Sequence, residues 1–592
     1  MKKILSREEV KKEYKWKTED LFKNDEIWQK SYDETERSFS ELEPYSRNMD
    51  VDSLYGCLKL RDKISVNVEQ LYVYANLKAN EDSTNTFYQE MSGKADRLIT
   101  LYSQAVSFIE PAILGMDREG LEKALNTDLK EYKHYTEDIL RNAEHILSAD
   151  KEEMLAQVYE VAEGPSNIFY MLNNADIEFK NATDSRGEEH TLTHGTYSSC
   201  LESKDRVLRR SAFDNVYDSY YKQKNTLAAI YSASVKKDVF SAKVRNYGSS
   251  LEAMLFANNI PTEVYHRLIE TVNKHLPLMH RYIRLRKKIL GLEDMDMYDI
   301  YTPIVDNIDT KKTYEEAKAT VLKALKPLGA EYCSTLEKAL NEEGWVDIYE
   351  NKGKRSGAYS WGAYGCHPFV SLNYDDKVNS MFTLAHEMGH AMHSHYTWST
   401  QPAVYGDYTI FVAEVASTVN EALLMEYLLK NAEEINERKY LLNYFMDQFR
   451  GTLFRQTMFA EFELKTHTMA ENGETLTFEN MCRLYSDLNK KYYGEDIVNN
   501  EKISWEWARI PHFYTAFYVY QYATGYSAAI TLSQKILKEN GAENYIDFLK
   551  GGSSKYSIDL LKSAGVDMTK GDAVENAMKV FEGLLDEMEG LI

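Results

Sequence analysis

Residues that interrupt helices are scarce in this chain of 592 residues, which contains only 10 prolines and 28 glycines. A typical soluble protein has about 5% proline and about 7% glycine. Because both residues destabilise helix interiors, their scarcity predicts a mostly α-helical fold. The chain also lacks any CxxC pair, since its cysteines are widely spaced: Cys57, Cys200, Cys333, Cys366 and Cys482. Neither a thiolate zinc site nor a disulfide framework is expected.

Long apolar runs and a basic charge balance are missing as well. No stretch approaches the roughly 18 apolar residues that a membrane-spanning helix requires. The basic start is followed by only Ile4 and Leu5 before charge returns, so no signal peptide is expected. Acidic residues outnumber basic ones by 93 to 70, a net charge of −23, which disfavours nucleic acid as a partner. We therefore expect a cytoplasmic protein with reduced thiols and no membrane partner.

Amphipathic helical patterns dominate the first half of the chain. In residues 84–110 apolar side chains recur every three or four positions, with Thr84 as the expected cap and Pro111 as the expected stop. Similar patterns occupy 64–79, 206–240, 263–290 and 313–340. The polar stretch 182–199 predicts a loop or a small hairpin. We place a domain boundary there, which divides the chain into 1–190 and 191–592.

The helical pattern is interrupted once, at residues 352–374. Gly357, Gly362 and Gly365 punctuate a segment rich in aromatic and β-branched residues. A phosphate loop is not indicated, because the GK[ST] signature is missing. The stretch 367–374 predicts a strand, and its edge could take up an extended peptide as a further strand. The residues expected at this edge are His367, Phe369, Val370, Ser371 and Leu372.

An HExxH motif follows at His386-Glu387-Met388-Gly389-His390. On a helix, positions i and i+4 lie on one face, so His386 and His390 can bind one Zn²⁺ together. Glu387 then faces a water molecule at the metal, and the pattern as a whole is a known zinc metalloprotease signature. Gly389 is a poor helix former, which suggests that a neighbouring element approaches closely here.

A third zinc ligand must come from elsewhere, because hydrolytic zinc sites use three protein ligands. The metzincin extension HExxHxxGxxH is absent, and His393 and His395 are weaker candidates. The segment 411–430 is strongly apolar but contains Glu414 and Glu421, seven residues apart and thus on one helix face. An unpartnered carboxylate in such a helix would be costly. We predict Glu414 as the third ligand and Glu421 as the acceptor that orients a ligand histidine.

These residues resemble the thimet oligopeptidase family of zinc endopeptidases, and within it the bacterial oligoendopeptidase F branch. The similarity covers HExGHxxH and FVAEVASTVNE, the preceding KRSGAYSWGAYGCHPFVSLNY, the later IPHFYTAFYVYQYATGYS, and the early WKTEDLFKND. It implies a large, mostly helical metallopeptidase with a deep substrate channel and a small β-sheet beside the HExxH helix. The domain 1–190 would form one wall of that channel, and 191–592 would be the catalytic zinc peptidase domain.

The resemblance also implies substrate-binding residues near the C-terminus. His512 matches the family's histidine, and Tyr518, Tyr522 and Tyr526 repeat every four residues, as on one helix stripe. These groups would bind substrate and stabilise the oxyanion. Which tyrosine does so is left open by the spacing from His512.

The sequence therefore predicts a zinc metalloendopeptidase with one Zn²⁺ per chain, zinc ligands His386, His390 and Glu414, and Glu387 as general base. Its expected partners are short unfolded peptides, and the expected assembly is a monomer or weak oligomer. A zinc carboxypeptidase is one alternative, with Arg450, Arg455 or Arg509 holding a substrate carboxylate. A non-catalytic peptide-binding protein with structural zinc is another, although Glu387 would then have no purpose.

Overall fold

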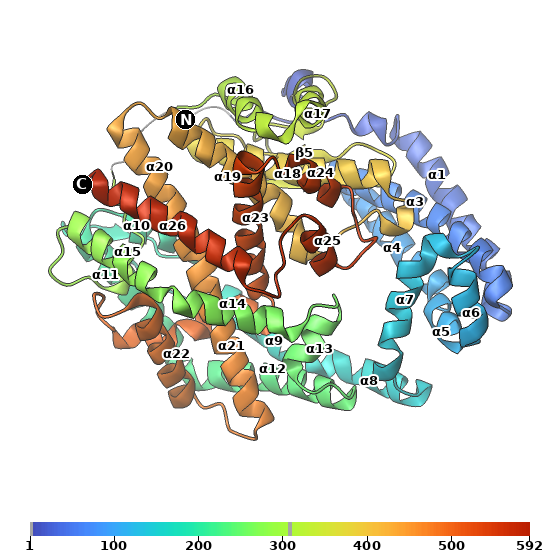
Figure 1. Ribbon diagram of the computed structural model, residues 1–592, viewed down its shortest axis with the longest axis horizontal. Coiled ribbons are helices and arrows are strands. Elements are labelled where there is room, and N and C mark those ends of the chain that lie inside the picture. Colours follow the sequence, from blue (N-terminus) through green and yellow to red (C-terminus); the bar gives the residue numbers. More distant parts are fainter. Residues whose placement is uncertain (1–3, 306–310) are drawn as a thin grey trace. The chain divides into compact units, whose positions relative to one another are not determined.

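The computed structural model describes residues 4–305 and 311–592 and is 71% helical with two small sheets. Its internal contacts divide it into two compact units. Figure 1 shows the chain coloured by residue number. Unit 1 contains residues 1–144, 310–427 and 532–565, and unit 2 contains 145–309, 428–531 and 566–592. The predicted boundary at 190/191 falls inside unit 2, because the hairpin there packs on a helix of the same unit.

Unit 1 is built mainly from helices. They are α1 (Asp25–Ser38), α2 (Glu43–Arg47), α3 (Val51–Glu81), α4 (Thr86–Val106), α5 (Ile109–Gly115), α6 (Arg118–Leu125), α7 (Lys133–Arg141), α16 (Tyr314–Ala324), α17 (Ala330–Asn341), α18 (Val378–Thr400), α24 (Ala542–Leu549) and α25 (Ser557–Ser563). Helix α3 lies along α4 (Figure 1), and their apolar faces meet in one core. The α4 pattern is capped by Asn85 rather than Thr84, and Pro111 lies in the first turn of α5.

A three-stranded sheet stands beside α18 in unit 1. Its strands are β3 (Val346–Asp347), β4 (Tyr359–Trp361) and β5 (Phe369–Ser371), in the order β3-β5-β4. Strand β5 pairs in parallel with β3 and antiparallel with β4. The predicted strand is thus confirmed, but its position at an edge is wrong. β5 is central, its two neighbours occupy both of its sides, and β4 is an edge strand instead.

Unit 2 is also helical. Its helices are α8 (Ala149–Ala162), α9 (Gly164–Met171), α10 (His194–Glu202), α11 (Arg206–Lys222), α12 (Lys224–Val244), α13 (Ser250–Phe256), α14 (Thr262–Lys274), α15 (Leu276–Ile289), α20 (Ile435–Gln448), α21 (Arg455–Glu471), α22 (Phe478–Tyr493) and α26 (Asp572–Gly590). The polar stretch forms the hairpin of β1 (Ala182–Thr183) and β2 (Glu189–His190), which lies on α11. Helices α19 (Ile410–Asn431) and α23 (Tyr520–Lys538) each contribute to both units.

One segment of the described chain, Thr86–Gly115, is long and apolar enough by composition to cross a membrane. It comprises α4 and α5, and Met91, Ala95 and Leu98 on its apolar face are buried in the core of unit 1. Since core helices of globular proteins pass the same test, this segment is weak evidence for a membrane span.

Candidate functional site: a histidine–carboxylate centre

The HExxH motif lies in the middle of α18, which runs beside β5 (Figure 1) and also contacts β4. Apolar side chains on either side of the motif, such as Leu384 and Ala391, are fully buried. The helix ends at Thr400, and Pro402 cannot continue it. The motif is therefore held on a rigid, well-packed element rather than on a loop.

His386 and His390 point toward Glu414 of α19. The Nε2 atom of His386 lies 3.4 Å from Oε2 of Glu414, and Nε2 of His390 lies 3.6 Å from the same oxygen. Ligands bound tetrahedrally to zinc at about 2.0–2.1 Å are separated by roughly 3.4 Å from one another. The three side chains offer two imidazole nitrogens and one carboxylate at this spacing, so they fit a zinc ion.

Gly389 allows α18 and α19 to approach each other. A Cβ atom at this position would lie 2.6 Å from Cα of Ser417 and 2.7 Å from the carbonyl oxygen of Ala416. Both obstacles are backbone atoms of α19, which cannot rotate away. The expected close neighbour is thus the helix that carries Glu414, and the missing side chain at Gly389 brings the histidines within reach of it.

Three further side chains of α19 support this group. Glu421 lies 3.4 Å from Nδ1 of His386, on the side opposite Glu414. Ser417 donates to Glu414 Oε2 at 3.0 Å, and Asn420, which is fully buried, donates to the carbonyl oxygen of Ala385 at 3.1 Å. The sequence prediction missed Ser417 and Asn420. Polar residues within an otherwise apolar helix, three and six positions after Glu414, were the available signal.

Burial and nearby charges perturb the titration of this group. Burial raises the pKa of Glu387 to about 7, with the carboxylates of Glu414 and Glu421 adding to the effect, while His386 and the backbone N–H of Ser360 oppose it. Burial works against protonation of His386, but the partner Glu421 and neighbouring carboxylates outweigh it and raise that pKa. Burial and the charge of His386 lower the pKa of His390. Glu387 thus has the proton affinity of a group that can both accept and release a proton near neutral pH.

A hollow of about 310 Å³ lies beside the sheet and the first turns of α18. Gly357 and Ala358 line it just before β4, Leu372 and Asn373 follow β5, and Thr383 lies one helical turn before Glu387. Of the predicted edge residues, Phe369, Val370, Ser371 and Leu372 are almost fully buried. His367 stacks on Trp345. These five residues support the sheet, in which β4 rather than β5 is an edge strand.

The two remaining histidines of α18 do not join the cluster. His393 is buried and stacks on Tyr408, with ring centroids 3.7 Å apart. His395 packs against Trp345 and Tyr396. Both belong to the packing around α18.

The predicted C-terminal residues are brought together only in part, within unit 2. The ring of His512 lies parallel to Tyr518, with centroids 6.1 Å apart, and its Nε2 is 3.4 Å from the hydroxyl of Tyr522. Tyr518 precedes α23 and follows Phe517, whose φ of 54° lies in the left-handed region. The tyrosines therefore do not form a single helix stripe. Tyr526 is buried and packs edge-on against Phe449.

The arginines considered as carboxylate binders are already engaged. Arg455 and Arg509 both pair with Glu506, at 2.9 and 2.8 Å. Arg450 donates to Asp447 at 3.2 Å. None of the three is an unpaired cation, which weakens the carboxypeptidase alternative.

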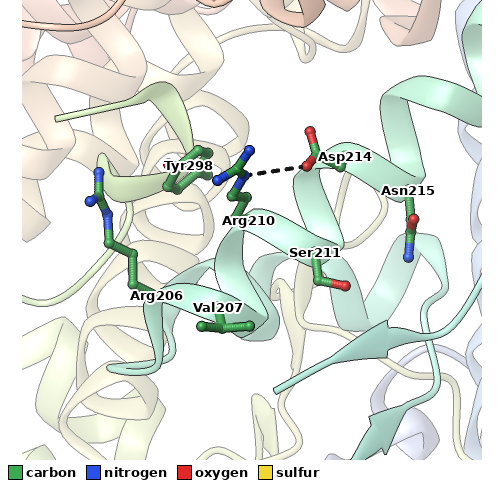
Figure 2. A pocket seen from close by; sticks show the side chains of 7 residues that line it. All are labelled: Arg206, Val207, Arg210, Ser211, Asp214, Asn215 and Tyr298. Carbon is green, nitrogen blue, oxygen red and sulfur yellow. Dashed lines mark ion pairs between the residues drawn. The ribbon is translucent and has the colours of Figure 1, made fainter. Parts of the chain in front are cut away.

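Two other polar groups in unit 2 have structural explanations. Asp184, Glu188 and His190 gather near the β1–β2 hairpin, but Arg186 already pairs with both acids. The hollow of about 480 Å³ in Figure 2 is lined by Arg206, Val207, Arg210, Ser211, Asp214, Asn215 and Tyr298. Its arginines pair with Asp299 and Asp214, and its Ser211 accepts a hydrogen bond from the backbone of β1. These side chains hold α11, β1 and the adjoining turn together.

Comparison with known proteins adds the family to this geometry. Residues 199–580 match peptidase family M3, and residues 113–179 match the family described as oligopeptidase F. The chain is 50% identical to oligopeptidase PepF of Bacillus subtilis, over 100% of this chain and 89% of that protein. It is 41% identical to the group B oligopeptidase PepB of Streptococcus agalactiae, over 99% and 98% of the two chains.

Solved structures agree. A putative peptidase from Chlamydophila abortus superposes with a TM-score of 0.95 at 36% identity over the full length of both chains. Oligoendopeptidase F from Enterococcus faecium superposes with a TM-score of 0.71 at 37% identity, over 96% of this chain and 99% of that one. The helical fold and the resemblance predicted from the sequence are thereby confirmed, and the chain belongs to peptidase family M3, a family of metallopeptidases.

Proposed function

We propose that this peptidase is a zinc-dependent endopeptidase that cleaves internal bonds of short, unfolded oligopeptides. The observation that carries the proposal is the joint position of His386, His390 and Glu414, at the spacing of zinc ligands, beside the buried Glu387. The names of the similar oligopeptidases and of oligoendopeptidase F support this substrate class and internal cleavage. One Zn²⁺ per chain would be held by these three side chains.

A bound zinc ion supplies Lewis acidity, which polarises a scissile carbonyl and makes a water molecule acidic near neutral pH. Glu387 takes the proton from the attacking water and later delivers it to the leaving amine, a role that its raised pKa suits. Glu421 keeps the proton on Nδ1 of His386, so that Nε2 presents its lone pair to the metal. Ser417 fixes the carboxylate of Glu414.

Substrate binding is proposed for two further groups. The outer edge of β4 can pair with an extended peptide backbone, a mode that reads chain extension more than sequence. His512, with Tyr518 and Tyr522 beside it, supplies donors for the substrate and the developing oxyanion. Removal of one such donor typically reduces kcat by about 10²–10³. We further propose that the protein acts in the cytoplasm as a monomer or weak oligomer, without nucleic-acid or membrane partners.

The test is hydrolysis of a quenched fluorescent peptide that is blocked at both termini. We expect internal cleavage that stops with a chelator, returns with zinc, and is lost in Glu387→Gln while zinc stays bound. Glu426→Gln on α19 is the control and should cleave normally. Trimming only of unblocked peptides would establish the carboxypeptidase alternative. Zinc binding without any cleavage would establish the binding protein.

A further inference from the structure

Unit 2 contains a buried group of arginines around Asp447. This carboxylate, at the end of α20, accepts from Nε of Arg450 at 3.2 Å and lies 3.6 Å from Nη1 of Arg286. It also accepts from the Tyr282 hydroxyl at 2.6 Å. Arg286 is fully buried, donates to the carbonyl oxygen of Thr302, and has no hydrogen-bond partner at Nε. One carboxylate thus serves two guanidinium groups.

A second carboxylate is shared in the same way. Glu506 accepts from both Nη atoms of Arg455, at 3.0 and 2.9 Å, and from Arg509 at 2.8 Å. The hydroxyls of Tyr217 and Tyr485 complete its shell, at 3.2 and 2.5 Å. Burial opposes ionisation of Glu506, but the two arginines outweigh it and lower its pKa far below the usual range. Glu506 is therefore ionised, and both of its carboxylate oxygens already accept hydrogen bonds.

Tyr301 connects the two groups. The guanidinium carbon of Arg450 lies 4.7 Å from the centroid of its ring. Burial opposes ionisation of the Tyr301 hydroxyl, but the charges of Arg455, Arg450 and Arg509 lower its pKa nevertheless. Among the described residues this hydroxyl has no hydrogen-bond partner, and neither have the two Nη atoms of Arg450.

Counted over the residues that the structure describes, the balance of charge in this region is positive. Four guanidinium groups face two carboxylates. The nearby Glu202, whose pKa is raised by burial and by the charge of Asp447, is exposed and pairs with none of these arginines in the described chain. The side chain of Arg450 is only 8% exposed. A buried cation without full compensation is costly, so a region of this kind attracts an anion.

The backbone at Arg450 points to a function as well. Residues Phe449–Phe454 form a π-helical turn between α20 and α21. Such turns are rare, and they occur frequently at functional sites. Here the turn separates Arg450 from Arg455, which lets them reach different carboxylates while both act on Tyr301.

We propose that Arg450 and Tyr301 bind a small monovalent anion of the chloride class. The two Nη atoms of Arg450 and the hydroxyl of Tyr301 would donate to it. Burial of Arg450 favours an inorganic ion over the end of a peptide. The bound ion would stabilise unit 2, which contains both side chains.

The test is thermal unfolding of the full chain, with potassium chloride replacing potassium gluconate at constant ionic strength. We expect a saturable rise in Tm, because chloride at ten times its Kd shifts the folding equilibrium about elevenfold. Tyr301→Phe, which removes only a hydroxyl, should weaken the effect, and Arg450→Gln should abolish it. Arg281→Gln, which removes a surface cation paired with Asp586 and Glu589, is the control and should respond like the unchanged chain.

A direct measurement accompanies the unfolding experiment. Crystals soaked in bromide should show an anomalous peak within hydrogen-bonding distance of Arg450 in the unchanged chain. The proposal would be overturned if Tm did not change with chloride, or if Arg450→Gln responded to chloride as strongly as the unchanged chain. Bromide peaks found only at other positions would overturn it as well. So would tyrosinate absorbance at neutral pH that disappears in Tyr301→Phe, because the chain would then supply its own counter-ion.

Discussion

Replacement of Gly389 by alanine tests whether the contact between α18 and α19 sets the geometry of the metal ligands. The new Cβ would lie 2.6 Å from Cα of Ser417 and 2.7 Å from the carbonyl oxygen of Ala416. Ordinary contacts between carbon atoms are about 3.5–4.0 Å, so the helices must separate by roughly 0.9 Å. His386 and His390 would move away from Glu414 by a comparable amount.

Two energetic effects oppose each other in this variant. Alanine improves helix propensity by about 1 kcal/mol relative to glycine, whereas overpacking costs about 1–3 kcal/mol. Because the obstacles are backbone atoms, we expect overpacking to prevail and Tm to fall. Zinc sites tolerate errors of only about 0.2 Å in ligand distance, so zinc affinity should fall by at least the roughly 10–100-fold that supporting residues typically contribute.

The assay is competition for zinc with a chelator, combined with thermal unfolding and peptide hydrolysis. Gly93→Ala is the matched control, since Gly93 lies within α4 and a Cβ there has nothing within 4 Å. It should raise Tm and leave zinc affinity unchanged. If Gly389→Ala also raised Tm and retained zinc affinity, the close contact would not be what positions the ligands.

Three other predictions concern single carboxylates. Glu421→Gln should weaken zinc binding about 10–100-fold by chelator competition, because His386 loses its charged acceptor at 3.4 Å; an unchanged affinity would remove Glu421 from this role. Burial raises the pKa of Glu69 from 4.5 to about 7. The stability that protonated Glu69 contributes is therefore fully present below about pH 4.5 and is lost as pH rises through about 7. Tm should therefore decline over this pH range, and Glu69→Gln, which still accepts from the backbone N–H of Tyr364, should abolish the decline. If the decline persists in the variant, another group causes it. Asp347→Asn should lower the free energy of unfolding by about 3–5 kcal/mol in denaturant titrations, because it leaves Arg7 and Lys354 without their shared buried partner, and a loss below about 1 kcal/mol would contradict this.

Helix content and the histidine–carboxylate centre were predictable because each depends on local spacing. HExxH fixes two ligands by helix periodicity alone, and the apolar setting of Glu414 and Glu421 marks them as unusual. The edge of the sheet was not predictable, because the order of three short strands depends on long-range pairing of β3 with β5. The predicted tyrosine stripe failed at Tyr518, where Phe517 adopts a left-handed conformation that no local pattern announces.

The division of the chain into interleaved units has a consequence for synthesis on the ribosome. Unit 1 needs residues 532–565 and unit 2 needs 566–592, so neither is complete until nearly the whole chain has emerged. Helix α26 alone contributes Ala577, Met578, Phe581 and Leu585 to the buried interior of unit 2. This chain therefore cannot fold domain by domain during translation, as large proteins commonly do. Its early segments remain with exposed apolar faces until the last residues have been synthesised. Binding by chaperones should therefore matter more for this chain than for a protein of equal length built from consecutive domains.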